Sequence, residues 1–292
     1  MKRLAVFMAL FVAGCGSFFA QPHTVALAYK TGDTYRYSLH MVLKYTIAAA
    51  GMSFPVNLDA SAKETVTVKS VDSSGTADVA VALSNMSLKT SFNGTTNTTT
   101  TTNTSTLDMK VAKDGRIISV NGSAFSQASL PGAYGTQGGL VTAILPDHAV
   151  KPGDTWTKTF DQENPLGTGS SQVTSNNTYL RDENSDAVIE SKIKGTIDVT
   201  IDTAAMAGQG GTPFVPPTGT TAPSLEGITV KGTSTSDVTS WIDLNARRLV
   251  KTHSTGSVNA TLTINMVGGS TTPGFSGPVT LKGTQSLDLN PA

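Results

Sequence analysis

The chain has 292 residues, with 21 Lys and Arg against 21 Asp and Glu, and only 14% of its residues are charged, against about 25% in ordinary soluble domains. So balanced and sparse a charge gives no clustered basic surface, which excludes nucleic acid as a partner. Thr, Ser, Asn and Gly take the place of charged residues. This composition favours an extracytoplasmic protein rich in β-strands, because Thr suits exposed strand positions.

The N-terminus has the layout of a secretory signal. Residues 1–3 carry two positive charges, residues 4–12 are apolar, and Val12-Ala13-Gly14 stands before Cys15, the one cysteine of the chain. A positive region, an apolar region and small residues in this order are typical of a signal that is removed. The segment Val12-Ala13-Gly14-Cys15 resembles the lipobox of bacterial lipoproteins, although Leu is more usual than Val at its first position.

The lipobox resemblance implies that residues 1–14 are a signal peptide, that Cys15 is the lipid attachment site and that residues 15–22 are a lipidated tether. Gly16 follows the cysteine. An Asp at this position would favour retention in the inner membrane. The resemblance therefore implies a lipid anchor in the outer membrane of a bacterial cell envelope. Simple secretion, with a periplasmic or extracellular location, and an uncleaved anchor are the alternatives. With Cys15 lipidated, no disulfide can form within the mature chain.

Residues 23–292 are expected to form one β domain. Apolar side chains recur at every second position almost throughout, which predicts half-buried strands with one wet face. Polar turns separate the strands, and only residues 136–145 could form a short helix. The clearest alternating segments are residues 34–41, 64–69, 77–83, 187–190, 197–201 and 257–264, and the clearest turns are residues 72–75, 113–115 and 184–186.

The domain contains a degenerate internal duplication, whose halves are about residues 23–145 and 146–292. Three elements recur in the same order, which is stronger evidence than any single match. Residues 29–35, 66–81 and 111–118 are echoed by residues 150–156, 178–189 and 243–250. We therefore expect an all-β fold with two degenerate meander repeats, forming one large curved antiparallel sheet or half-barrel with at most one short helix.

Two polar segments of low complexity interrupt the strands. Residues 93–106 are nearly all Thr and Asn, and residues 204–224 are rich in Gly, Pro and Thr. Both lie between predicted strands, so we interpret them as long, mobile hairpin loops and not as domain linkers.

The most distinctive motif is Val150-Lys151-Pro152-Gly153-Asp154-Thr155-Trp156. Pro followed by Gly suits a type II turn, and Trp156 then enters a strand with its ring towards the core. The segment resembles a loosely defined set of uncharacterised bacterial secreted or lipoprotein β-domains with a Val-Lys-x-Gly-Asp-x-Trp element. More distantly, the expected architecture is similar to half-barrel lipoprotein carriers of the envelope, which sandwich acyl chains.

No constellation of catalytic, cofactor-binding or metal-binding residues stands out. The Asp182–Asp186 turn has calcium-like spacing, but Ala187 stands where a calcium loop needs Gly and Ile193 where it needs Glu. Residues 274–278 miss the Gly-x-Ser-x-Gly nucleophile motif by one position. The four histidines, His23, His40, His148 and His253, show no paired metal spacing.

The leading hypothesis is an envelope-anchored lipoprotein without enzymatic activity that binds a hydrophobic ligand, such as a lipid, or a protein partner. A large sheet that is apolar on one face must cover that face, by curling or by holding something against it. The alternative is a structural or adhesive module of the cell surface with no ligand cavity. No cofactor is expected, and the sequence does not identify a protein partner.

Overall fold

In the computed structural model, the described residues are 22–49, 51–92, 94–122, 142–163, 167–202, 225–266 and 278–292. Cys15 and the expected signal peptide lie outside them. Within these ranges the chain is all-β, as predicted. No helix with the length and hydropathy needed to cross a membrane occurs among the described residues.

Twelve strands form one sheet. They are β1 (Thr34–Ala49), β2 (Met52–Val71), β3 (Ala77–Phe92), β4 (Thr95–Thr101), β5 (Ser105–Val111), β6 (Ile117–Gly122), β7 (Thr155–Glu163), β8 (Gly167–Glu183), β9 (Asp186–Asp202), β10 (Leu225–Asp243), β11 (Arg248–Met266) and β12 (Val279–Pro291).

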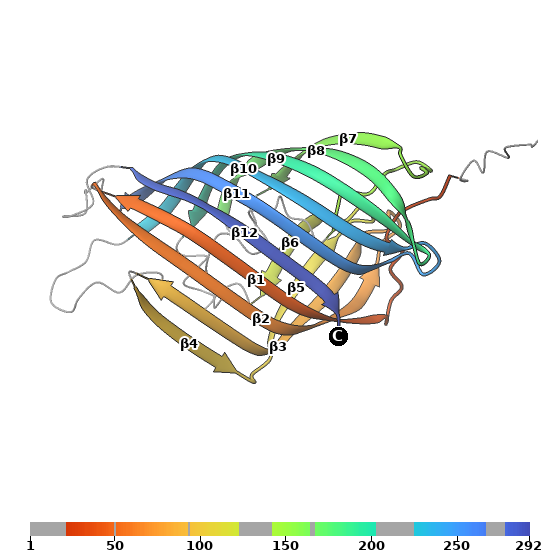
Figure 1. Cartoon of the computed structure of the whole chain (residues 1–292), viewed down its shortest axis with the longest axis horizontal. Coiled ribbons are helices and arrows are strands. Elements are labelled where there is room, and N and C mark those ends of the chain that lie inside the picture. The colour runs from red at the N-terminus through yellow and green to blue at the C-terminus, as the bar shows by residue number, and fades with distance from the viewer. Residues whose placement is uncertain are drawn as a thin grey trace, which may run out of the picture.

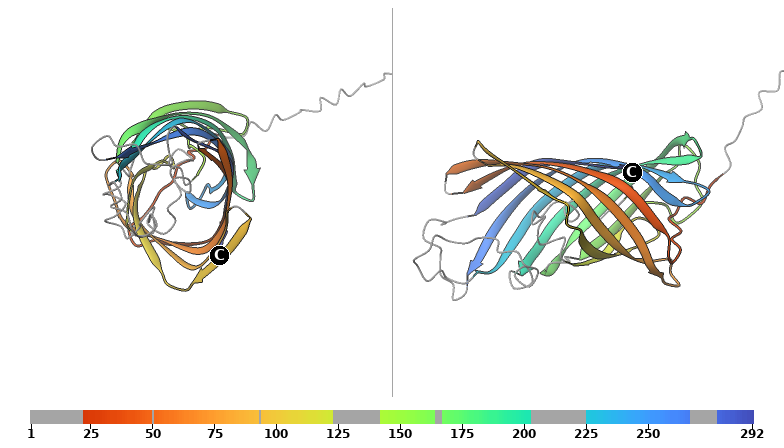
Figure 2. Two further views of the ribbon diagram at one scale, coloured as in Figure 1. Left: turned by 90° about the vertical axis from the view of Figure 1, so that its left-hand side faces the viewer. Right: turned by 90° about the horizontal axis from the view of Figure 1, so that it is seen from below.

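The sheet rolls up almost into a barrel. Its order is β6-β5-β3-β2-β1-β12-β11-β10-β9-β8-β7, with β4 added beside β3, and every described pairing is antiparallel. β6 and β7 end this path, so a seam lies between them. Figure 1 shows the rolled sheet from the side, and Figure 2 shows it end-on as a ring of strands. The prediction of one continuous sheet is confirmed.

The order of the strands matches the predicted duplication. β6, β5, β3, β2 and β1 follow one another in the same order as β11, β10, β9, β8 and β7, and β12 stands between the two sets. Each set has the same connections: a Lys-x-Gly-Asp turn leads into its first strand, and two further polar turns join its second strand to its third and its last two strands to each other. The two halves are therefore the same meander used twice.

The two Lys-x-Gly-Asp turns are held alike. The Gly32 N–H donates to the Val68 carbonyl (2.9 Å), and the Val68 N–H donates back to the Asp33 carbonyl (2.9 Å). In the second copy, Gly153-Asp154 and Tyr179 repeat both hydrogen bonds, at 2.7 and 3.0 Å. The two glycines have φ angles of +90° and +93°, which residues with a Cβ rarely adopt. The predicted turn before Trp156 is confirmed.

One local prediction is wrong. Residues 95–101 of the Thr/Asn segment form β4, which pairs with β3 from Met86 to Phe92 and projects from the rolled sheet (Figure 1). Thr has a high preference for strands, and this outweighed the polar composition that indicated a loop. Residues 136–145 were the one segment that could have formed a short helix: residues 142–145 are bent and extended, and the remainder lies outside the described residues, as does the segment 204–224.

We name the two ends of the rolled sheet by their connections. The turn end carries the short turns β2–β3, β5–β6, β8–β9 and β10–β11, and the rim end carries the hairpin connections β1–β2 and β3–β4. On the inward face, buried apolar side chains alternate with outward polar ones, which is the pattern of a sheet with one wet face.

The tight roll requires a residue without a Cβ at Gly283 of β12. This glycine lies opposite Tyr45 in the register with β1. A Cβ built there would stand 2.1 Å from Tyr45 Cδ1 and 2.3 Å from the Lys44 carbonyl oxygen. Since one of these atoms belongs to the backbone, the clash cannot be relieved by rotating a side chain. Strong bends of rolled sheets commonly use glycine in this way.

Gly283→Ala should therefore destabilise the protein by at least about 2 kcal/mol, because overpacking against backbone forces β1 and β12 apart. Urea unfolding measures the change. Thr284→Ala, one residue further on the outward face of the same strand, is the matched control and should stay within about 0.5 kcal/mol. Equal midpoints for the two variants would show that the close approach has no energetic role.

Candidate ligand-binding interior

Two segments enter the interior at the turn end, and we call them the inner plug: residues 22–29 and residues 142–150, of which residues 147–149 are exposed. The segments pair with each other through His23 and Val150, whose N–H groups each donate to the other's carbonyl, at 2.6 and 2.9 Å. The Leu145 N–H donates to the β5–β6 turn at the Asp114 carbonyl, at 3.0 Å. The plug is thus tied both to itself and to the sheet.

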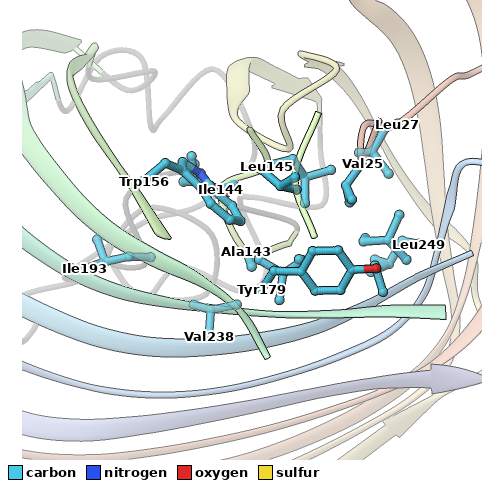
Figure 3. Close-up of a cluster of buried hydrophobic side chains, with 14 of the residues drawn as sticks. Val25, Leu27, Ala143, Ile144, Leu145, Trp156, Tyr179, Ile193, Val238 and Leu249 are labelled. Carbon is cyan, nitrogen blue, oxygen red and sulfur yellow. Dashed lines mark hydrogen bonds between the residues drawn. The ribbon is translucent and has the colours of Figure 1, made fainter. Parts of the chain in front are cut away.

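The plug carries apolar side chains into the core of the turn end. Ala143, Ile144 and Leu145 have no exposed surface, and Val25 and Leu27 are 1% and 3% exposed. Figure 3 shows them against side chains of the rolled sheet, among them Tyr179, Ile193, Val238 and Leu249. Trp156, which the sequence placed in the core, belongs to the same cluster.

Side chains of the rolled sheet form hydrogen bonds with the backbone of the plug. The Ala143 N–H donates to Ser240 Oγ, and the Ile144 N–H donates to Ser191 Oγ, both at 2.8 Å. The indole Nε1 of Trp156 donates to the Ile144 carbonyl at 3.1 Å. Because a buried N–H without an acceptor is costly, these inward serines are needed wherever the plug has no neighbouring strand.

Asn177 organises the acceptors around the plug. Its Oδ1 accepts hydrogen bonds from Ser175 Oγ and Ser191 Oγ, both at 2.6 Å, and its Nδ2 donates to the Trp156 carbonyl at 3.1 Å. Ser240 Oγ is similarly joined to Thr252 Oγ1 at 2.8 Å. These polar side chains are all buried, so they form a polar patch within an apolar core.

The seam is closed by side chains at the turn end. Asp114, which is 7% exposed, accepts hydrogen bonds from Arg116 Nε at 3.0 Å and from Lys158 Nζ of β7 at 3.3 Å. The Arg116 guanidinium lies 5.0 Å from the centre of the Phe160 ring, also on β7, within range of a cation–π interaction. Among the described residues, the two ends of the sheet are therefore joined by these charged groups and not by a strand ladder.

A small cavity lies beside the plug, and a few polar groups stand in its mostly apolar lining. It has a volume of about 30 Å³, room for one water molecule. Its lining includes Tyr29, Tyr37, Glu64 and Arg248. Burial raises the pKa of the Tyr29 and Tyr37 hydroxyls well above their usual value, and it raises the pKa of Tyr35 to about 12. These hydroxyls stay neutral at physiological pH, and Tyr37 donates its proton to the Leu249 carbonyl at 2.8 Å.

Towards the rim end, the inward face is a continuous apolar surface, which we call the apolar wall. It comes from adjacent strands, β2, β1, β12, β11 and β10, and no residue of the inner plug belongs to it among the described residues. Its buried members are Met41, Leu43, Tyr45, Leu58, Val230, Val258, Ala260 and Leu281.

The apolar wall continues to the rim. Phe54 of β2 and Phe92 of β3 stack with their ring centres 5.9 Å apart, and Met52 precedes them on the same face of β2. Met52 is 56% exposed and Phe92 is 52% exposed. We call these three residues the apolar rim. The exposed fraction of these side chains thus rises from the middle of the apolar wall towards the rim.

The outer face offers a different surface. A trough of about 580 Å³ crosses β1, β12, β11 and β10 and is open to solvent. Hydroxyl side chains such as Thr235, Thr255 and Thr284 line it, and its only charged residues are Lys44 and Asp237. Small-molecule sites are usually enclosed and mostly apolar, so the interior is the better candidate.

The histidines do not meet in the structure. His40, His148 and His253 each pair with a different carboxylate, and all three pairs are exposed. His23 pairs through its backbone. Among the residues that the structure describes, no group of three or more His, Cys, Asp or Glu side chains is placed to hold a metal ion.

The Asp182–Asp186 segment is a hairpin turn, as its interpretation as a turn predicted. Asn184 and Ser185 have φ angles of +52° and +73°, the pattern of a tight hairpin connection. Asp182 accepts a hydrogen bond from the Tyr179 hydroxyl, and Glu183 accepts one from Arg181. Both carboxylates therefore accept hydrogen bonds from within the hairpin.

Known proteins give little guidance. No family model and no curated protein matches the chain. Among solved structures, the chain is similar to lipovitellin, in a structure that concerns lipid–protein interactions, with 11% identity and a TM-score of 0.46. The match covers 90% of this chain but 26% of that one, so the chain spans about a quarter of that protein's chain. A likeness at this level carries no argument about function.

Sequence reasoning missed the inner plug and the apolar wall as separate features. The alternation of Met41, Leu43 and Tyr45 was visible as a half-buried strand, but a pattern of period two does not say what lies against the buried face. Residues 142–146 carry no repeating pattern, so no signal placed them inside the sheet.

Ser191→Ala should lower the free energy of unfolding by about 1–3 kcal/mol, because the Ile144 N–H loses its buried acceptor. Hydrogen exchange gives the specific check: the Ile144 amide should lose protection, while the Leu145 amide, bonded to the Asp114 carbonyl, should lose less. Ser53→Ala, at an exposed strand position, is the control. Unchanged protection at Ile144 would contradict the assigned hydrogen bond.

Asp186→Asn should stabilise the protein at neutral pH by a few tenths of a kcal/mol, since this site is mostly solvated. Partial burial and then the charges of Asp243 and Glu183 raise the pKa of Asp186 in the folded protein. The ionised carboxylate therefore opposes folding above its raised pKa, and this penalty disappears as the pH falls below about 3.8. Unfolding curves at pH 7 and pH 3 measure the effect; an equal difference at both would contradict it.

Proposed function

We propose that the protein is an envelope-anchored lipoprotein that carries an apolar ligand against the apolar wall and has no enzymatic activity. One observation carries the proposal. The interior is divided, with the turn end packed by the inner plug, while the apolar wall towards the rim end meets no residue of that plug among the described residues.

The chemistry of the wall fits a ligand that is a long hydrocarbon. Side chains of the wall come from neighbouring strands of one curved surface, so they offer a smooth apolar face and not a set of directed hydrogen bonds. Each methylene that such a surface removes from water contributes about 0.8 kcal/mol. A lipid or another elongated apolar molecule would gain most from this shape.

The distribution of polar groups supports binding without catalysis. Ser191, Ser240 and Asn177 hold the plug, Asp114 and Lys158 hold the seam, and the tyrosines of the small cavity are kept neutral by burial. These groups have structural partners, and they lie at the turn end, away from the proposed ligand.

The anchor is part of the proposal. Residues 22–29 belong to the plug, so the described chain enters the rolled sheet at the turn end. Intact mass spectrometry of the chain isolated from its own envelope tests the anchor: we expect an N-terminal Cys15 with the added mass of acyl chains. A free thiol at this residue would contradict lipidation and leave simple secretion.

Native mass spectrometry of the same preparation tests carriage. We expect excess mass that dissociates as a lipid or another hydrophobic molecule and so identifies the cargo. A bare polypeptide mass that takes up no lipid when challenged would contradict carriage and favour the structural or adhesive module.

A substitution that fills the interior should compete with the ligand. Ala60 of β2 lies on the inward face beside Met41 and Leu88 and is only partly buried. Ala60→Trp should weaken binding of a fluorescent fatty acid at least about fivefold, because the indole would cover apolar side chains that the ligand is proposed to contact. Ser61→Trp places the same side chain outward on the next residue and should bind as the wild type does.

Fluorescence titration measures both variants, and Ala60→Leu gives a smaller obstruction should the indole disturb folding. Circular dichroism and the midpoint of urea unfolding confirm that each variant is folded. Equal affinities for the Ala60 and Ser61 variants would contradict a ligand on the apolar wall.

A further inference from the structure

The chain is uncharged around the apolar rim. Residues 45–58, which include the β1–β2 connection, contain no Asp, Glu, Lys or Arg, and neither do residues 90–107, which include the β3–β4 connection. The turn end is different: each of its short turns carries charged residues. These are Asp72, Lys113, Asp114, Arg116, Arg181, Asp182, Glu183, Asp186, Asp243, Arg247 and Arg248.

The rim has exposed apolar side chains at a projecting edge. The β1–β2 and β3–β4 hairpins project at the same end of the rolled sheet (Figure 1), and the stacked rings of Phe54 and Phe92 join them. Met52 and Phe92 are more than half exposed. Exposed apolar patches mark protein or membrane interaction sites, and apolar side chains of peripheral proteins bury in the boundary between headgroups and acyl chains.

The apolar rim is continuous with the apolar wall. Phe54 and Phe92 lie on the inward face, where Val56 of β2 is opposite both Phe92 of β3 and Tyr45 of β1. A hydrocarbon that leaves a lipid layer at the rim would therefore meet apolar side chains all the way to Leu43 and Leu58. It would not have to cross a ring of charges.

We infer that the apolar rim of Met52, Phe54 and Phe92 docks on a lipid surface and is the port through which the apolar ligand reaches the wall. The inference rests on the proposed carriage of such a ligand and adds its source, a lipid layer. A second copy of the chain is a poorer occupant. Three side chains expose far less apolar area than the roughly 1,000 Å² that a stable interface needs.

Two double variants of the full chain separate the rim from exposed apolar residues in general. Met52→Ser with Phe92→Ser removes the exposed part of the rim. Ile118→Ser with Leu180→Ser is the matched control, because these side chains are 45% and 39% exposed and lie in β6 and near the end of β8, away from the rim. Unfolding midpoints show that both remain folded.

The first measurement compares two sources of the same fluorescent fatty acid: free monomer in solution, and phosphatidylcholine donor vesicles. Relative to the wild type, we expect the rim variant to lose at least about tenfold more in the rate of extraction from vesicles than in the uptake of free monomer. Two half-exposed apolar side chains would no longer contribute to docking. The control variant should match the wild type in both assays. Equal extraction rates for all three proteins would overturn the port.

The second measurement does not depend on ligand binding. Phe92→Trp adds an indole to the rim, and Ile118→Trp adds one at the control position; quenching of each is taken as the difference from the wild type, which contains Trp156 and Trp241. With brominated phosphatidylcholine in added vesicles, we expect quenching of the indole at position 92 and none at position 118. Quenching at 92 without any uptake of monomer would overturn carriage but leave the docking. Uptake of monomer without quenching at 92 would overturn the docking alone.

Discussion

An extended segment inside a rolled sheet has no neighbouring strand, and the structure depends on how its backbone is satisfied. The N–H groups of Ala143 and Ile144 find hydroxyl acceptors on Ser240 and Ser191. Without such acceptors, several kcal/mol of unsatisfied buried backbone would favour expelling the segment. The plug in turn supplies the side chains that fill the turn end. The division of the interior into a packed end and an apolar wall therefore follows from a few inward polar residues.

The repeated meander explains what could be predicted from the sequence. Lys-x-Gly-Asp at residues 30–33 and 151–154 indicated equivalent turns, and the strand order confirmed it. Period-two alternation predicted the strands and the buried position of Trp156. These features are local or repeated, so a single sequence contains enough information to recognise them.

The remainder depended on contacts between distant residues. Ser191 and Asn177 were unremarkable polar positions in strands until the structure placed Ile144 beside them. The Thr-rich segment at residues 95–101 was assigned to a loop from its composition, whereas pairing with β3 made it a strand. Residues 142–145 are not helical, because their backbone N–H groups donate to Ser240, Ser191 and the Asp114 carbonyl of the sheet. Cys15 lies outside the described residues, so its lipidation stays a prediction.

The seam has a consequence for the size of the interior. In a sheet that closes on itself, the number of strands and their stagger fix the radius. Here the hydrogen-bonded path stops at β6 and β7 among the described strands, and Asp114, Lys158, Arg116 and Phe160 hold these edges together only at the turn end. Towards the rim, no described backbone hydrogen bond crosses the seam. The circumference of the rolled sheet can therefore change at the seam without breaking a backbone hydrogen bond between the described strands.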